Sequence, residues 1–481
     1  MLRAILGLVL AAAPIQAAPV RLPAQPLGVA WSPVYGFPPA KPETFVPQAR
    51  AIGAGGVRLT LYWSQLQPAS GVTRWDVLDA YLAQIGRPED ATLTIATASP
   101  WATRSHAWVF PSSPASDPAR YEAFVRDVVT HVHGRIRYFQ AENEPNNPFF
   151  WAGSADDYAA EQRVFYRVVK AADPKAIVML GASDGLFDPS GADPFPGQDK
   201  DVAFWAQVLK ATAGAYDLFD LHLYGNPYTI PARVDAVRVM MRAAGGEKPI
   251  ISSEYSGPSF FEFKANRRQW ASLQGPAAGP DSVRALRAKD ANLPVETRMF
   301  LHPDDADLQR HMLRLQSEDL VVRNLIALSE GIARTHFFQL VRDTKDPDAP
   351  NTILYGHMAL LARGTDGALI ELPLAERFRR LADALRGTRA VTRVTVAAQP
   401  DVYAFRVKRR GRPPLLIAWR RPALAGAAAA AAPVTVPVKF GHAVAETIEG
   451  DTAIPVVAPT GVRIDLSDMP VLIAAPDKAR H

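Results

Sequence analysis

Short apolar runs alternate with amphipathic segments through most of the chain. Eight of these runs have strand length and are rich in β-branched and aromatic residues: 27–31, 57–63, 91–97, 136–141, 176–181, 219–224, 249–255 and 334–340. Between them lie segments with apolar residues at helical spacing: 42–53, 75–82, 121–133, 156–171, 203–211, 233–244, 308–331 and 374–385. Strands that alternate with helices predict parallel strands joined by crossover helices.

This alternation fits two architectures, a doubly wound open sheet and a closed (β/α)₈ barrel. The eight units and the polar residues at several strand ends favour the barrel. A dinucleotide-binding open sheet would carry a Gly-x-Gly-x-x-Gly motif after its first strand, and the sequence has none there. We therefore predict an α/β fold with a TIM barrel over residues 22–387, interrupted by a long insertion at about residues 257–303.

The pattern changes after residue 387, where short β-rich runs follow one another without helices. These runs are residues 391–397, 402–407, 414–419, 434–438, 443–448, 462–466 and 471–475. Short strands at this spacing are typical of a β-sandwich. We therefore predict a small C-terminal β-sandwich domain at residues 388–478.

Residues 1–17 have the pattern of a signal peptide for secretion. A short positive start is followed by an apolar run at residues 4–13, which is too short to span a bilayer, and then by small residues up to Ala17. The chain has no further apolar stretch of spanning length and no cysteine. These features predict a secreted or periplasmic protein without a membrane span. A net charge of +5 on 481 residues, with no long basic run, argues against a nucleic-acid partner.

Candidate chemistry gathers just beyond the predicted strands. Glu144 follows the fourth strand and Glu254 lies near the end of the seventh, so a barrel would bring both to one mouth. Paired carboxylates perform glycoside hydrolysis, in which one protonates the leaving oxygen and the other attacks the anomeric carbon. Arg58 and Tyr224 would keep Glu254 ionised. Glu144 is less compensated and is expected to have the raised pKa of a general acid.

Four further side chains are expected at this mouth as substrate-binding groups: Asn143, His222, Trp63 and Trp101. Each assignment has a structural alternative. A strand-end glutamate such as Glu254 can be an ion-pair partner, Arg58 alone is more often structural, and His222 can be a hydrogen-bonded core residue. The functional interpretation rests on their combination.

Glu142 is a third carboxylate close to the candidate acid. Strand alternation places Glu142 and Glu144 on one side and Asn143 on the other, unless a bulge turns it. His131 and His133 resemble a metal pair, but they lie at a helix end away from the predicted mouth and have no evident third ligand. We expect no metal and no other cofactor.

The insertion at residues 257–303 is expected to be either a solvated loop or a lid over the mouth. In a lid, its aromatic residues Phe260, Phe261, Phe263 and Trp270 would stack on sugar rings. Its basic residues would then favour an acidic polysaccharide and an endo-acting enzyme.

Several motifs resemble one enzyme family. Residues 138–146, Tyr-Phe-Gln-Ala-Glu-Asn-Glu-Pro-Asn, resemble the strand-four motif of clan A glycoside hydrolases. The runs Asp-Leu-His-Leu-Tyr at 220–224, Ser-Glu-Tyr at 253–255 and Val-Arg-Leu at 57–59 resemble the signatures of other strands in that clan. Within it, the sequence is most similar to family 39 and to related bacterial exopolysaccharide-associated glycosidases, over most of residues 25–360.

The resemblance implies a retaining mechanism on an oligo- or polysaccharide, with Glu144 as acid/base and Glu254 as nucleophile. It implies that Asn143 binds the sugar 2-hydroxyl and that Arg58 and Tyr224 support the nucleophile, with no cofactor. A transglycosylase of the same clan, or an inactive glycan-binding scaffold, remains an alternative.

Two positions depart from the family pattern. Glu142 stands where the clan commonly has Trp or Gly, and Phe337 and Phe338 stand where the eighth strand commonly carries a Trp. The identity of the monosaccharide therefore stays open.

Overall fold

The structure is a computed structural model, and it describes residues 23–31, 44–87, 90–184, 187–192, 198–274, 278–342, 346–423, 426 and 428–475. The predicted signal peptide, residues 1–17, lies outside the described residues. Among the residues described, no helix is both long enough and apolar enough to cross a bilayer.

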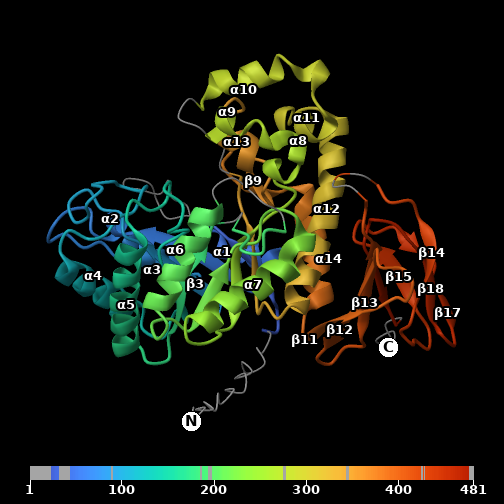
Figure 1. The fold of residues 1–481 in the computed structure, drawn as a ribbon, viewed down its shortest axis with the longest axis horizontal. Coiled ribbons are helices and arrows are strands. Elements are labelled where there is room, and N and C mark those ends of the chain that lie inside the picture. Colours follow the sequence, from blue (N-terminus) through green and yellow to red (C-terminus); the bar gives the residue numbers. More distant parts are fainter. Residues whose placement is uncertain are drawn as a thin grey trace, which may run out of the picture.

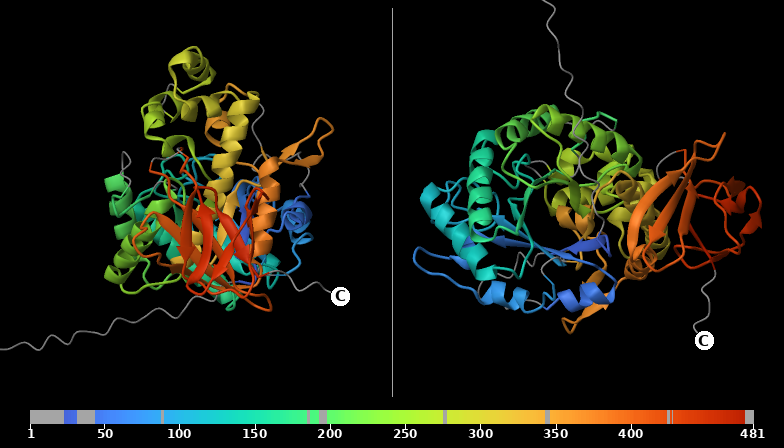
Figure 2. Two further views of the ribbon diagram at one scale, coloured as in Figure 1. Left: turned by 90° about the vertical axis from the view of Figure 1, so that its right-hand side faces the viewer. Right: turned by 90° about the horizontal axis from the view of Figure 1, so that it is seen from below.

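Eight parallel strands close into a barrel (Figures 1 and 2). They are β1 (Leu27–Ala30), β2 (Val57–Tyr62), β3 (Ala91–Ala96), β4 (Tyr138–Ala141), β5 (Ile177–Ser183), β6 (Leu218–Leu221), β7 (Ile250–Tyr255) and β8 (Thr335–Phe338). Each strand pairs with its neighbour in sequence, and β1 pairs with β8 to close the ring. The predicted barrel is therefore confirmed, and the carboxyl ends of all eight strands share one mouth.

Helices surround this barrel because each of them presents an apolar face to the strands. The main ones are α1 (Val46–Ala51), α3 (Asp76–Leu82), α4 (Pro118–Val132), α5 (Ala155–Ala172), α6 (Gln198–Ala211), α7 (Ile230–Ala243), α12 (Ala306–Ser329) and α14 (Pro373–Leu385), with the short α2 (Trp63–Leu66) directly after β2. Their starts agree with local sequence signals. The Asp117 side chain accepts a hydrogen bond from Ala119 N at the start of α4, and Ser154 with Asp157 forms a capping box at α5.

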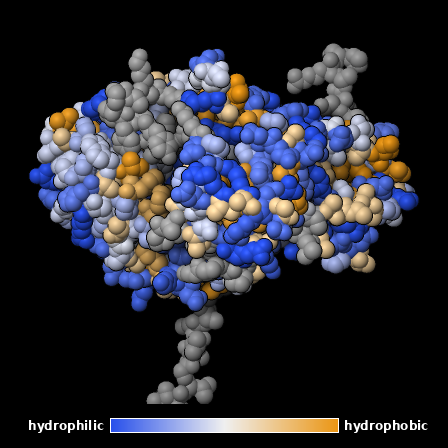
Figure 3. Space-filling model, turned by 90° about the horizontal axis from the view of Figure 1, so that it is seen from above, coloured by the Kyte–Doolittle hydropathy of each residue, from blue (hydrophilic) through white to orange (hydrophobic). Residues whose placement is uncertain are grey.

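The insertion after β7 folds into a helical cap that stands over the mouth (Figure 1). We define the cap as α8 (Lys264–Arg267), α9 (Trp270–Gln274), α10 (Pro280–Arg287) and α11 (Val295–Leu301), together with α13 (Pro350–Tyr355), which follows β8. The cap has its own apolar core, in which Phe260, Phe261 and Phe263 are buried with residues of α12 and α13. Seen from above, this side of the molecule is mostly hydrophilic, with small separate hydrophobic patches (Figure 3).

The cap excludes a solvated loop, agrees with a lid over the mouth, and corrects the role expected for its phenylalanines. The segment is not a solvated loop, because its apolar residues pack on one another. The phenylalanines proposed to stack on sugars are also not available, since Phe260, Phe261 and Phe263 are used in the core of the cap. The side chain of Trp270, the fourth aromatic residue of that proposal, lies outside the described part of the chain.

The C-terminal β-sandwich is confirmed, with two antiparallel sheets. The larger sheet has the order β11-β12-β13-β19-β15-β16 and contains β11 (Thr388–Val394), β12 (Val402–Arg409), β13 (Leu415–Arg420), β15 (Val444–Thr447), β16 (Thr452–Ala453) and β19 (Val471–Ala474). The smaller has the order β14-β18-β17, from β14 (Ala432–Val436), β17 (Val456–Ala458) and β18 (Gly461–Leu466). The alternation along β13 explains the layering: Ile417 and Trp419 join the core of the barrel, whereas Leu416 and Ala418 face the smaller sheet.

Candidate active site

The turn after β4 sends three successive side chains in different directions. Glu142 and Glu144 have positive φ angles of 65° and 44°, so strand alternation ends at Ala141. Glu142 points toward α5 and is within hydrogen-bond distance of the backbone N–H of Thr97. Asn143 turns to Arg58, and Glu144 turns to His222. The expectation that Glu142 and Glu144 share a side is therefore wrong, because the left-handed backbone at both residues breaks the period of two.

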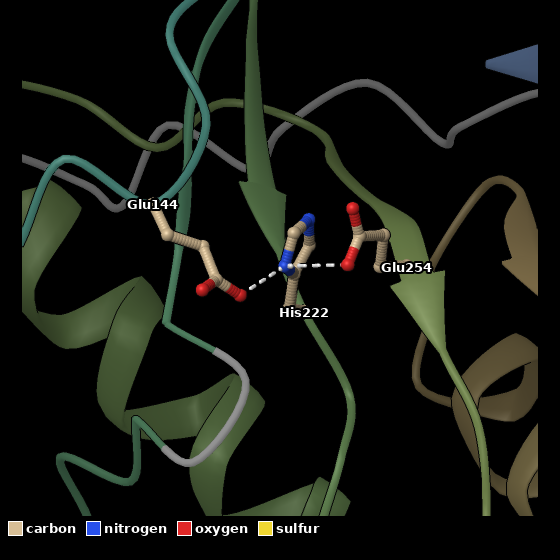
Figure 4. A group of neighbouring side chains, drawn as sticks. All are labelled: Glu144, His222 and Glu254. Carbon is tan, nitrogen blue, oxygen red and sulfur yellow. Dashed lines mark hydrogen bonds and ion pairs between the residues drawn. The ribbon is translucent and has the colours of Figure 1, made fainter. Parts of the chain in front are cut away.

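Glu144 and Glu254 face each other across His222 (Figure 4). Nδ1 of His222 lies 2.7 Å from Oε1 of Glu144 and 3.7 Å from Oε2 of Glu254. One oxygen of each carboxylate and a nitrogen of this ring all lie within 4.8 Å of one another. The barrel thus brings a carboxyl oxygen from the turn after β4 within 4.8 Å of one from β7.

Glu254 is held by donors from β2 and from the loop after β6. Arg58, which is 2% exposed, donates from Nη1 to Oε1, and the hydroxyl of Tyr224 donates to Oε2 at 3.1 Å. Arg58 also donates from Nη2 to Oδ1 of Asn143 at 2.7 Å and to Oε1 of Gln140 at 2.9 Å. The buried guanidinium therefore balances the Glu254 charge and fixes the orientation of the Asn143 amide.

A chain of hydrogen bonds fixes the tautomer of His222. Gln140 Nε2 and the Ser253 hydroxyl both donate to Oδ2 of Asp220. Because the Ser253 hydroxyl has a single proton and gives it to Asp220, its oxygen can only accept from His222 Nε2, which lies 3.2 Å away. Nε2 therefore carries a hydrogen, and the Nδ1 atom faces Glu144 with one proton to share.

Burial and nearby negative charges raise the pKa of the Glu144 carboxyl to about 7. Burial is the largest cause, the charge of Asp184 is the next, and the charge of Glu254 adds to them, whereas His222 opposes the shift. Asp184 lies just beyond β5 and accepts a hydrogen bond from Nδ2 of Asn147 at 2.8 Å. Glu144 is 7% exposed and is thus a buried carboxyl poised to carry a proton near neutral pH.

The cap contributes Tyr355 to the same mouth. Burial and then the charges of Glu144, Asp184 and Glu254 raise the pKa of its phenol. Its ring lies edge-on to Phe338 at the end of β8, with ring centroids 6.3 Å apart, and its hydroxyl accepts from Gln274 Nε2 at 3.2 Å. A tyrosine from the cap thus stands beside the strand position where the family pattern has a tryptophan.

Glu142 forms a buried carboxyl pair with Glu161 of α5. Burial, followed by the charge of Glu142, raises the pKa of Glu161 well above its usual range, and burial raises the pKa of Glu142 too. Thr97 holds both partners, because its N–H donates to Glu142 and its hydroxyl donates to Glu161 at 2.7 Å. Two buried carboxyl groups within hydrogen-bond reach of each other cannot both be charged, so the pair retains a proton. It thereby joins the turn after β4 to α5.

Replacing Glu161 by glutamine should raise the free energy of unfolding above pH 7. The wild-type carboxyl keeps its proton when folded but is ionised above about pH 4.3 when unfolded. Stability therefore falls as pH rises from about 4.3 toward the raised pKa, by up to about 1.4 kcal/mol per pH unit, and levels off above that pKa. A glutamine amide can keep both hydrogen bonds without a proton to lose. Urea denaturation between pH 5 and 9 measures the difference, with Asp156→Asn on the exposed face of α5 as the control. Parallel curves for Glu161→Gln and the wild type would exclude the shared proton.

One of the expected substrate-binding residues, Trp63, does not reach the mouth. Trp63 is completely buried and stacks on Phe124 with ring centroids 4.6 Å apart, so it is a core residue. Trp101 packs edge-on against Trp63 and donates from its indole to the backbone oxygen of Gln67 at 2.9 Å. The Trp63 assignment is corrected, because its indole packs in the core against α4. Trp101 is only partly buried, and its assignment stays a prediction.

His131 of the possible metal pair has other partners. His131 stacks on Trp75 with centroids 4.1 Å apart, and its Nε2 lies 2.6 Å from Asp79 Oδ1.

At the mouth, the Glu144, His222 and Glu254 side chains have the composition of a cation site. However, the guanidinium of Arg58 already occupies one side of Glu254, and its charge opposes a second cation there. A metal-free site stays our prediction.

Several residues of this site were missed by sequence reasoning: Gln140, Asp184, Asp220, Ser253 and Tyr355. Two of them carried a signal. Gln140 and Asp220 are polar residues inside otherwise apolar strands, and such residues need buried partners. Asp184 lies in the connection after β5 and Tyr355 at the end of the short helix α13, and no periodic pattern marks either residue.

The fold was compared with known proteins. A family 39 glycoside hydrolase from the gut symbiont Bacteroides cellulosilyticus WH2 aligns with a TM-score of 0.60 at 14% identity, over 96% of this chain and 83% of that one. A monomeric β-xylosidase from Caulobacter crescentus CB15 aligns with a TM-score of 0.56 at 16% identity, over 95% and 97%. A family 51 α-L-arabinofuranosidase from Bifidobacterium longum gives 0.55 at 13%, over 95% and 97%. At these identities the likeness shows a shared fold. No protein-family model and no curated protein matches the sequence.

Proposed function

We propose that this protein is a retaining glycoside hydrolase that cleaves an oligo- or polysaccharide by double displacement. The observation that carries this proposal is the pair Glu144 and Glu254, whose nearest ligand oxygens lie within 4.8 Å at the mouth of the barrel. Retaining enzymes have carboxyl groups about 5–5.5 Å apart, whereas inverting enzymes need a wider gap for water. The fold shared with family 39 glycoside hydrolases supports the same assignment.

In the first step, an oxygen of Glu254 attacks the anomeric carbon as the bond to the leaving oxygen breaks. Glu144 gives its proton to that oxygen, so the leaving group departs as a neutral alcohol and a glycosyl ester forms on Glu254. The raised pKa of Glu144 means that this proton is present near neutral pH. The hydrogen bond to His222 holds the carboxyl in place for the transfer.

In the second step, Glu144 is a carboxylate and removes a proton from water. The water oxygen attacks the anomeric carbon, and Glu254 leaves as a carboxylate beside Arg58. The sugar is released with its original anomeric configuration, and both glutamates return to their starting states. The sum of the two steps is hydrolysis of one glycosidic bond.

Asn143 is placed to bind a sugar hydroxyl during both steps. Arg58 can only donate hydrogen bonds, so the oxygen of the Asn143 amide must face it at 2.7 Å. The amide nitrogen remains as a donor for the substrate. This orientation suits the 2-hydroxyl contact that the family resemblance implies.

The proposal is tested by incubating the purified chain with aryl β-xyloside, aryl α-L-arabinofuranoside, aryl β-glucoside and the corresponding polysaccharides. Proton NMR of the first product should show the anomeric configuration of the substrate. Product analysis with added alcohol separates water from sugar as the acceptor, and so distinguishes hydrolysis from transglycosylation. First products of inverted configuration, or a correctly folded chain that cleaves none of these glycosides, would overturn the proposal.

The value of kcat/KM should fall as pH rises through about 7, because Glu144 must be protonated to act as the acid and its pKa is about 7. Asp184→Asn removes a negative charge that raises this pKa, so the fall should move to lower pH. Asp184→Glu keeps the charge and should keep the midpoint near that of the wild type. The measurement is kcat/KM from pH 4 to 10 on one aryl glycoside. Identical midpoints for Asp184→Asn and the wild type would contradict this account of the acid.

A further inference from the structure

We propose that an exposed aromatic surface beside the mouth binds the leaving-group side of a neutral polysaccharide chain. This surface, the aromatic rim, consists of Trp108, Phe110, Phe149 and Phe150. The inference rests on the proposed hydrolase, since it extends the substrate from the cleaved bond across the loops that follow β3 and β4. It assigns these residues a contact with sugars that do not react.

Two of the rim's aromatic side chains are largely exposed to solvent. Trp108 is 50% exposed and Phe149 is 60% exposed. Among the described residues, they are the aromatic members of the set of exposed large hydrophobic side chains, which otherwise contains aliphatic residues. Contiguous exposed apolar surface on a soluble protein commonly marks a binding site.

Three of the four rings contact one another directly. Phe149 and Phe150 meet edge-on with centroids 5.0 Å apart, and Phe110 contacts them at 5.2 and 5.0 Å. Phe110 in turn lies edge-on to Tyr62, a buried residue at the end of β2, at 5.4 Å. The exposed rings are therefore anchored to the barrel.

Backbone hydrogen bonds join the two loops that carry the rim. Ser112 N donates to Phe150 O at 2.7 Å, and Ala152 N donates to Ser112 O at 2.8 Å. The hydroxyl of Ser64 holds the backbone oxygen of Trp108 at 2.5 Å. Because the rings sit on a fixed backbone, the protein loses little conformational entropy when a sugar chain binds to them.

The rim lies on the side of the proposed acid. Asn147 N donates to Glu144 O at 2.9 Å, and Phe150 N donates to Asn147 O at 3.0 Å, so two consecutive short turns connect the acid to the rim. Glu144 gives its proton to the leaving oxygen. The sugar attached to that oxygen, and the next along the chain, therefore extend toward Phe149 and Trp108.

The chemistry of the rim favours an uncharged glycan. Residues 107–112, Ala-Trp-Val-Phe-Pro-Ser, and 148–152, Pro-Phe-Phe-Trp-Ala, contain no charged side chain. A pyranose ring presents an apolar face of C–H groups that stacks on an aromatic face. An anionic polysaccharide would need cations to balance it, and these two segments provide none.

The test uses Trp108→Ala/Phe149→Ala in the full chain, with the Glu254→Gln substitution added for binding. The probes are xylohexaose, cellohexaose and β-1,6-glucohexaose, with polygalacturonate as an anionic probe. Calorimetry should show at least one neutral probe bound roughly tenfold more weakly by the rim variant, equal to about 1.4 kcal/mol. Ile454→Ala, at an 82% exposed site in the β-sandwich, should bind like its parent.

In the active background, the rim variant should lose at least about tenfold more kcat/KM on the hexasaccharide than on an aryl monosaccharide. Equal affinities for parent and rim variant, no binding of any neutral probe, or a rim-dependent preference for polygalacturonate would overturn the inference. So would a dimer of the parent, seen by sedimentation, that the rim substitutions dissociate without weakening glycan binding. Since calorimetry needs no turnover, a chain that binds through the rim but cleaves nothing refutes the hydrolase alone.

Discussion

Glu254→Gln is expected to reduce turnover by at least about 10⁴-fold, because the amide cannot form the glycosyl ester. The substituted glutamine keeps the size of the side chain and can still accept from Tyr224, which lies 3.1 Å from Glu254 in the wild type. The loss would therefore report on the nucleophile. The measurement is kcat/KM on an aryl glycoside with a good leaving group, for which departure needs little help from an acid.

Glu254→Ala provides the sharper experiment, since the shortened side chain leaves room for a small anion. Azide bound in that space attacks the anomeric carbon from the face that Glu254 normally uses, and no second displacement follows. The product should be a glycosyl azide of inverted configuration. A glycosyl azide of retained configuration would assign the nucleophile to another residue.

Folding has to be checked in both variants. Removal of the Glu254 charge leaves Arg58 without its carboxylate partner, and an unpaired buried charge destabilises a protein. Circular dichroism and thermal unfolding establish whether each variant is folded at the assay temperature. A folded Glu254→Gln enzyme with undiminished turnover would remove Glu254 from the mechanism.

Glu144→Gln should give losses that depend on the leaving group. A sugar or alcohol leaves poorly without a proton, so its release should slow by roughly 10²–10⁴-fold, the usual contribution of general acid catalysis. A dinitrophenolate leaves without a proton, so the first step on a dinitrophenyl glycoside should be nearly unaffected. The measurement is kcat/KM on a series of aryl glycosides whose leaving groups differ in pKa.

The matched control for the acid is Glu142→Gln, a second buried carboxyl two positions earlier. Glu142 points to Glu161 and Thr97, so its replacement should not produce a dependence on the leaving group. In Glu144→Ala, azide should intercept the glycosyl enzyme and give a glycosyl azide of retained configuration, opposite to that from Glu254→Ala. Equal losses on every leaving group would contradict the role of Glu144.

Sequence reasoning located both glutamates because it needed only the strand ends. The carboxyl ends of parallel strands in a barrel lie at one mouth. A residue just after β4 and the second-last residue of β7 are therefore expected to lie close together. The same argument brought His222 and Tyr224 to the site. Arg58 is the second residue of β2 and reaches Glu254 through its long side chain. It failed for Trp63, whose position at the end of β2 looked equivalent but whose indole lies in the core.

The directions of side chains at the mouth could not be predicted in the same way. Glu142 points away from the mouth because its φ angle is positive, and the alternation of side chains along a strand does not predict such an angle. Asp184 and Tyr355 are far from Glu144 in sequence, and only the folded chain brings them near it. There, the charge of Asp184 raises the pKa of Glu144, and the charge of Glu144 raises the pKa of Tyr355. The insertion was likewise ambiguous, since its aromatic residues could stack on a ligand or on one another.

The sequence by itself determined the barrel, the β-sandwich and the two carboxylates at one mouth. These follow from hydrophobic periodicity and from the common direction of parallel strands, which are properties of local segments and topology. The tertiary structure alone decided which groups raise the pKa of Glu144, where Glu142 points and which aromatic rings remain exposed. Those outcomes depend on burial and on charges brought close through space, so they exist only once the whole chain has folded.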